Sequence, residues 1–317
     1  MPALGTWGFI VTFSGQGLRN VVGWWAFGVI AAISGVMLFL VFVREGHRVQ
    51  WRALPAMACA YTILCMVSVI WSHYPRETVL AGLLMLATTT TGVLLACGLS
   101  LRQFTDALSR ALEATLVLSF LLELYVALVL REPLVPIYMK DWEEVPPSYI
   151  WVEGNIFQGG PIQGIVGNRN PLAFIALLTL ICVVVRWRDY RLRLPNFLIW
   201  SALSIMTLIL TGSATVIVAA VVCGIVMLFL WLLRHVPVAL RTTVIVAAST
   251  LGVAVIVFAI GWHSQVTALL GRSPDMTGRW EIWLKVIDLW EQHTFLGWGW
   301  IMYWVPWIPM FGTLVIR

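Results

Sequence analysis

Three arginines in polar segments offer the most specific chemistry in this sequence. Arg169 follows a Gly-Asn pair, and Arg272 and Arg279 bracket the stretch S-P-D-M-T-G. A guanidinium is planar, stays charged in any environment and donates paired hydrogen bonds to phosphate oxygens. These arginines are therefore candidates to bind the phosphates of a lipid-linked ligand. The alternative is that their side chains extend to the headgroups of membrane lipids.

Small polar residues accompany these arginines. Asn168 and Asn170 flank Arg169, and Ser213 and Thr215 belong to the stretch T-G-S-A-T between two apolar runs. Their amides and hydroxyls could orient a donor or an acceptor by hydrogen bonding. For the hydroxyls, the alternative is a structural role, because small polar residues commonly support close packing of membrane helices.

Carboxylates and imidazoles give weaker signals. Glu123 lies within an apolar run, so it should face the protein interior, either in a hydrogen bond across helices or in proton coupling. Glu113 is predicted at the solvated end of the same run. The acids of Asp141–Glu144 favour a solvated loop over a divalent-metal site. His263 and His293 have no acid placed to orient them and are interpreted as surface residues.

The composition requires an integral membrane protein. Of the 317 residues 60% are hydrophobic and only 11% are charged, and the mean hydropathy is +0.90. Soluble domains carry about 25% charged residues, so soluble and disordered classes are excluded. The net charge of +5 is attributed to cytoplasmic loops rather than to nucleic-acid binding. The five cysteines are predicted to be buried and unpaired, and no motif predicts a metal or cofactor.

Apolar runs of spanning length repeat along the chain, since a helix needs about 20 residues to cross a bilayer. They lie at about 21–43, 53–71, 78–98, 112–130, 171–187, 195–212, 214–233 and 242–262. A shorter apolar segment at 3–18 could form a further helix. We therefore predict an all-α, polytopic transmembrane helix bundle of about eight or nine spans, forming a single membrane domain over residues 1–317.

Arginine-rich loops alternate with arginine-poor ones, and the positive-inside rule predicts that the rich set is cytoplasmic. The rich loops lie at 44–52, 99–110, 186–194 and 234–241. Two longer segments, 131–170 and 263–317, are then predicted to be extracytoplasmic. The second contains an amphipathic stretch from Arg279 to Glu291, expected to lie at the membrane interface. The tryptophans of these outer segments favour an aromatic belt, with sugar stacking as the alternative.

Four stretches between about 70 and 315 resemble, in order and spacing, motifs of the O-antigen ligase/polymerase superfamily. They are Trp71–Pro75 (WSHYP), Gln163–Leu172 (QGIVGNRNPL), Leu210–Thr215 (LTGSAT) and Thr277–Trp283 (TGRWEIW), the last with Leu296–Gly299 (LGWG) behind it. The resemblance implies a metal-independent, GT-C-type glycosyltransferase of the cell envelope that needs no cofactor.

The resemblance also implies the reaction and its partners. A glycan would pass from undecaprenyl pyrophosphate to an acceptor glycan or lipid at the outer face of the bacterial cytoplasmic (inner) membrane. The partners would be the lipid-linked oligosaccharide donor, the glycan or lipid acceptor and membrane lipids. By motif position Arg279 would be the principal pyrophosphate ligand, with Arg169 and Arg272 assisting; Asn168, Asn170, Ser213 and Thr215 complete the predicted substrate-binding set.

Two departures from the family pattern leave alternatives open. Ala214 replaces an arginine that many relatives carry, and no histidine occupies the later H-N motif in which relatives place their base. The catalytic residue is therefore unassigned, and the family's closing spans are expected to be missing. The alternatives are a polysaccharide transporter or flippase, for which Glu123 would be the only mid-span carboxylate, and a catalytically inactive scaffold of the assembly machinery.

Overall fold

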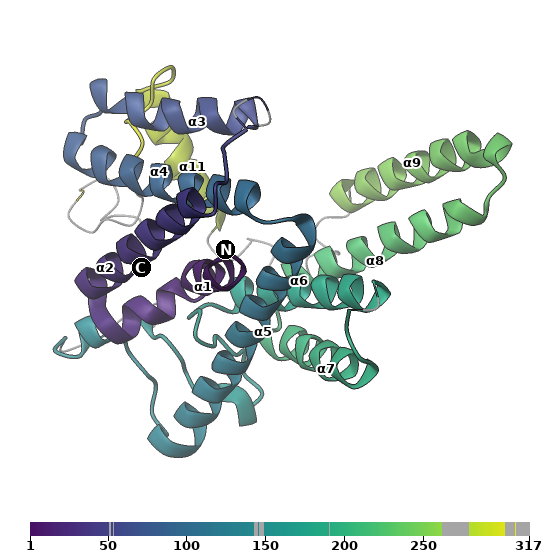
Figure 1. Cartoon of the computed structure of the whole chain (residues 1–317), viewed down its shortest axis with the longest axis horizontal. Coiled ribbons are helices and arrows are strands. Elements are labelled where there is room, and N and C mark those ends of the chain that lie inside the picture. The colour runs from purple at the N-terminus through teal and green to yellow at the C-terminus, as the bar shows by residue number, and fades with distance from the viewer. Residues whose placement is uncertain are drawn as a thin grey trace. The chain divides into compact units, whose positions relative to one another are not determined.

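A computed structural model describes residues 1–50, 52, 54–142, 145, 149–189, 191–261, 279–301 and 308. These residues form helices that are mostly joined by short turns, with a longer segment between residues 130 and 169 (Figure 1). The α-helices are α1 (Pro2–Phe13), α2 (Gly15–Arg44), α3 (Ala56–Val67), α4 (Pro75–Gly98), α5 (Leu101–Tyr125), α6 (Arg169–Arg188), α7 (Leu194–Thr211), α8 (Ala214–His235), α9 (Val238–Gly261) and α11 (Arg279–Gln292). The shorter helical turns include η2 (Ser68–Ile70), η3 (Val126–Leu130), η4 (Ile137–Met139) and η6 (Asn155–Phe157).

Six of the described helices are long and apolar enough to cross a membrane. They are Gly15–Arg44, Pro75–Gly98, Leu101–Leu130, Arg169–Arg188, Leu194–Thr211 and Ala214–His235. Shorter apolar helices lie at Pro2–Phe13, Ala56–Ile70 and Val238–Ala254. The predicted all-α, polytopic membrane class is confirmed. Which end of each helix faces the cytoplasm stays a prediction.

Local signals in the sequence explain where several helices begin, bend and end. Ser100 begins α5 with a capping box, in which its hydroxyl accepts from the Gln103 N–H and the Gln103 side chain accepts from the Ser100 N–H. Gly23, with φ of 81°, interrupts α2. Gly212, with φ of 55°, ends α7 in the left-handed conformation that glycine adopts without steric cost.

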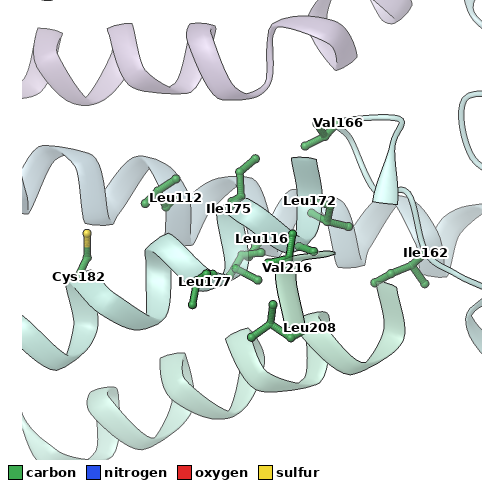
Figure 2. Packing of buried hydrophobic residues seen from close by; sticks show 12 residues of the cluster. Leu112, Leu116, Ile162, Val166, Leu172, Ile175, Leu177, Cys182, Leu208 and Val216 are labelled. Atoms are coloured by element: carbon green, nitrogen blue, oxygen red, sulfur yellow. The ribbon is translucent and has the colours of Figure 1, made fainter. Parts of the chain in front are cut away.

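The chain divides into two compact units, each described here by itself. Unit 1 comprises residues 1–54 and 88–221, and unit 2 comprises residues 55–87 and 222–317. The apolar core of unit 1 joins α5, α6, α7 and the first turn of α8. Figure 2 shows Leu116 of α5, Leu172 of α6, Leu208 of α7 and Val216 of α8 among its side chains. The single membrane domain predicted over the whole chain stays a prediction.

A buried ion pair connects the first half of α5 to the last turn of α6. Arg186 of α6 lies 2.7 Å from the Glu113 carboxylate and 3.2 Å from Asp106, and both Arg186 and Glu113 are only 8% exposed. The prediction that Glu113 is a solvated helix end is therefore wrong. The reason is that the start of α5 is amphipathic and its polar side faces Arg186. The apolar run at 112–130, from which the span was predicted, does not include this start.

Candidate functional site

Polar side chains gather in unit 1 where α6 begins. Asn168 is the N-cap of α6, and its side-chain oxygen accepts the N–H of Asn170 at 2.9 Å. Arg169 is the first residue of the helix and is exposed. The G-N-R-N stretch therefore presents a guanidinium at the positive end of the α6 dipole, an arrangement that favours an anion.

The turn between α7 and α8 meets this helix start. Ser213 is 1% exposed, and its hydroxyl donates to the side-chain oxygen of Asn170 at 2.7 Å. The carbonyl of Ser213 accepts the N–H groups of Val216 and Ile217 in the first turn of α8. Thr215 is exposed in the same turn. This hydrogen bond joins the N-termini of α6 and α8. It also brings together the motifs Gln163–Leu172 and Leu210–Thr215.

The loop that leads into α6 is fixed by a buried carboxylate. Glu123 is fully buried in α5, and its Oε1 accepts the N–H of Gln163 at 2.8 Å and of Gly164 at 2.7 Å. The Ser119 hydroxyl accepts the next N–H, from Ile165, at 3.2 Å. The hydrogen bond predicted for Glu123 is present, but its donors belong to a loop rather than to a neighbouring helix. Within the described part of the chain its Oε2 has no partner.

The remaining predicted phosphate ligands are described only in part. Arg279 is the first residue of α11, so the helix predicted from Arg279 to Glu291 is confirmed. The side chain of Arg279 lies outside the described residues, and so does Arg272 together with the whole segment 262–278. The structure therefore tests neither arginine as a phosphate ligand.

Unit 2 contains a contact between two histidines that the sequence analysis did not predict. The ring centroids of His73 and His293 lie 4.5 Å apart, and those of His293 and Trp298 lie 4.3 Å apart. The backbone N–H of His73 donates to the Trp298 carbonyl at 3.4 Å, which joins the two turns that carry these rings. His73 is exposed and His293 is half-buried.

Further hydrogen bonds join the WSHYP turn to the LGWG loop around this pair. The Trp71 indole donates to the Leu296 carbonyl at 2.8 Å, and the Ser72 hydroxyl donates to the Trp298 carbonyl at 3.2 Å. The interpretation of His293 as a surface residue without an orienting group is therefore incomplete, since His73 and Trp298 hold its ring. The sequence held one sign of this contact, because the WSHYP turn and the LGWG loop both belong to the set of motifs that resembles the family.

The described residues offer no metal site. No group of three or more histidine, cysteine or acidic side chains in that part of the chain could hold a metal ion. Of the acidic stretch at 141–144, Glu143 and Glu144 lie outside the described residues, so its interpretation as a solvated loop stays a prediction.

One comparison with known proteins gives a match. Residues 199–314 match the family model described as O-antigen ligase. The matched range contains Ser213, Thr215, Arg272 and Arg279, and it extends past the LGWG stretch. Neither the curated proteins nor the solved structures contain a match to the chain.

Proposed function

We propose that the chain belongs to the O-antigen ligase/polymerase superfamily, on the evidence of the match at residues 199–314, and that it transfers a glycan from undecaprenyl pyrophosphate. The match supports a role in glycan transfer during surface-polysaccharide assembly. The proposed acceptor is a second glycan or a lipid, and the proposed location is the outer face of the bacterial inner membrane. The six candidate spans support an integral membrane protein.

The observation that carries the proposal is the 2.7 Å hydrogen bond between Ser213 and Asn170. It holds the N-termini of α6 and α8 together beside the exposed guanidinium of Arg169. A pyrophosphate leaving group gains negative charge as its bond to the sugar breaks. Fixed dipoles and a guanidinium that meet this charge stabilise the transition state more than the ground state, which is what accelerates the reaction.

The proposed reaction is a displacement at the anomeric carbon of the donor. An acceptor hydroxyl loses its proton, its oxygen bonds to that carbon, and the carbon–oxygen bond to the pyrophosphate breaks with its electron pair going to phosphate. From its motif position we assign Arg279 as the principal phosphate ligand, with Arg169 and Arg272 assisting. The reaction needs no metal or nucleotide sugar, and the group that accepts the proton is unassigned.

The test is transfer by the full chain in proteoliposomes that contain an undecaprenyl-pyrophosphate glycan. A charged hydrogen bond is worth about 1.5–3 kcal/mol, so Arg169→Ala should lower kcat/KM about 10- to 100-fold, and Arg169→Lys should lower it less. Arg279→Ala should abolish product formation while the protein still inserts into the membrane. Arg188→Ala is the matched control, because Arg188 is an exposed arginine at the far end of the same helix.

Each alternative predicts a different result in the same proteoliposomes. A transporter or flippase would move substrate with coupled ion flux and form no new glycosidic bond. An inactive scaffold would do neither. Either result from the wild-type chain would overturn the proposal, and so would unchanged turnover in both Arg169→Ala and Arg279→Ala.

A further inference from the structure

A polar cavity of about 590 Å³ lies in unit 1, where α5 ends and the segment 150–158 crosses it. Val126 lies in its wall, and its polar lining comes from Arg131, Glu132, Glu153, Asn155 and Gln158. Pockets for small ligands in proteins occupy about 300–1,000 Å³, so the cavity has room for a short saccharide. None of its polar lining residues belongs to the predicted substrate-binding set.

The backbone at one edge of this cavity is unusual. The last turn before it, Val126–Leu130, is a π-helix, and the N–H of Arg131 closes the turn by donating to the Val126 carbonyl at 2.8 Å. Arg131 has φ of 58° and is the one non-glycine residue with positive φ in the described ranges. Such conformations cost free energy and are frequent at functional sites. Here they turn the chain so that Arg131 and Glu132 both line the cavity.

The opposite wall is held close by a tight backbone contact. Gly154 has φ of 74°, and a Cβ at this position would lie 2.9 Å from Cγ1 of Val126. Trp151 and Val152 pack with Val126 in a small buried cluster beneath it. This part of the wall is therefore packed before a ligand binds, which lowers the entropy that binding must overcome.

The lining matches the hydroxyl groups of sugars. Carboxylates accept hydroxyl protons, the guanidinium donates, and the amides of Asn155 and Gln158 can do both. The Asn155 amide already donates to the Glu153 carboxylate, which orients both groups. One arginine against two glutamates gives the lining a net charge of 1 − 2 = −1. Acidic sugars are therefore repelled, and neutral sugars are favoured.

The cavity is connected to the start of α6 through a single loop. The Glu153 N–H donates to the Gln163 side chain at 3.2 Å, and the Gln163 N–H donates to Glu123. Five residues later the same loop reaches Asn168 and Arg169. We propose that the cavity binds neutral saccharide units of the glycan that the protein transfers. This inference rests on the proposed function and adds to it the class of sugar and the residues that contact it.

The first test measures binding to the purified full chain, using an array of neutral and uronic-acid-containing bacterial oligosaccharides. The wild-type chain should bind neutral members and not their acidic counterparts. Arg131→Gly suits the backbone at φ of 58°, so it should keep the fold and lower affinity at least tenfold, as should Gln158→Ala. Lys140→Ala is the control, because Lys140 is exposed on the same segment but does not line the cavity.

A second test separates this inference from the proposed function. In the transfer assay, Arg131→Gly and Gln158→Ala should raise KM for the donor about tenfold and leave kcat within about twofold. Transfer by the wild-type chain with unchanged KM and glycan affinity in both variants would overturn the cavity assignment alone. Neutral-glycan binding that these variants weaken, without any transfer, would retain the cavity and overturn the proposed function. A preference for acidic oligosaccharides would also overturn the inference.

Discussion

Replacing Glu123 by leucine should destabilise unit 1 by removing the acceptor that fixes the loop into α6. The Oε1 of Glu123 accepts the partly buried N–H of Gln163 at 2.8 Å and the buried N–H of Gly164 at 2.7 Å. A buried donor left without a partner costs about 1–3 kcal/mol, so leucine should cost about 2–6 kcal/mol in total. Glutamine keeps an oxygen at Oε1 and should lose less than half as much.

Thermal unfolding of the detergent-solubilised chain at a fixed scan rate measures this difference. For a protein of this size about 1 kcal/mol lowers Tm by about 2 °C, so Glu123→Leu should unfold about 4–12 °C below the wild type. Glu291→Leu makes the same chemical change at an exposed position of α11 and should shift Tm by about 1 °C or less. The reasoning fails if Glu123→Leu unfolds no earlier than Glu123→Gln.

Two further predictions concern unit 1. Arg186→Met leaves the buried carboxylate of Glu113 without a counter-charge and should lower the free energy of unfolding by about 3–5 kcal/mol. Adding Glu113→Leu should restore at least half of the lost Tm. No recovery in the double variant would contradict the ion pair as the cause. Gly164 and Gly212 both have positive φ, but a Cβ at Gly164 would lie 2.5 Å from Cβ of Ser119, while nothing lies within 4 Å of one at Gly212. Gly164→Ala should therefore lower stability by about 1–3 kcal/mol more than Gly212→Ala in the same measurement, and equal losses would show that packing is not the source.

The positions of the helices were predictable because each span must bury a continuous apolar run in lipid. The runs at 171–187, 195–212 and 214–233 correspond closely to α6, α7 and α8. The start of α5 was not predictable in this way, since α5 begins at Leu101 in a segment that was interpreted as an arginine-rich loop. Its first turns are polar on one side, and the Ser100–Gln103 capping box begins the helix there. The packing of Arg186 against Glu113 shows why the polar side is buried farther along the helix.

The candidate site was predictable only as far as its motifs. The residue types of Asn170 and Ser213 suggested polar contacts, but the hydrogen bond between them joins positions 43 residues apart. Glu123 could be placed in the protein interior, in a hydrogen bond across helices or in proton coupling, because a carboxylate facing lipid is costly. Its actual donors could not be inferred, since backbone N–H groups exist in every loop and carry no sequence signature.

The contacts among the motifs give a physical reason for their order along the chain. In unit 1 the stretch Gln163–Leu172 meets Leu210–Thr215 through Asn170 and Ser213. In unit 2 the turn Trp71–Pro75 meets the loop Leu296–Gly299 through Trp71 and Ser72. The pairs are therefore nested, with the second motif joined to the third and the first joined to the last. In unit 1 both partners are side chains, so a change in either Asn170 or Ser213 removes the hydrogen bond. In unit 2 the acceptors are backbone carbonyls, so the hydrogen bonds depend on the side chains of Trp71 and Ser72 alone.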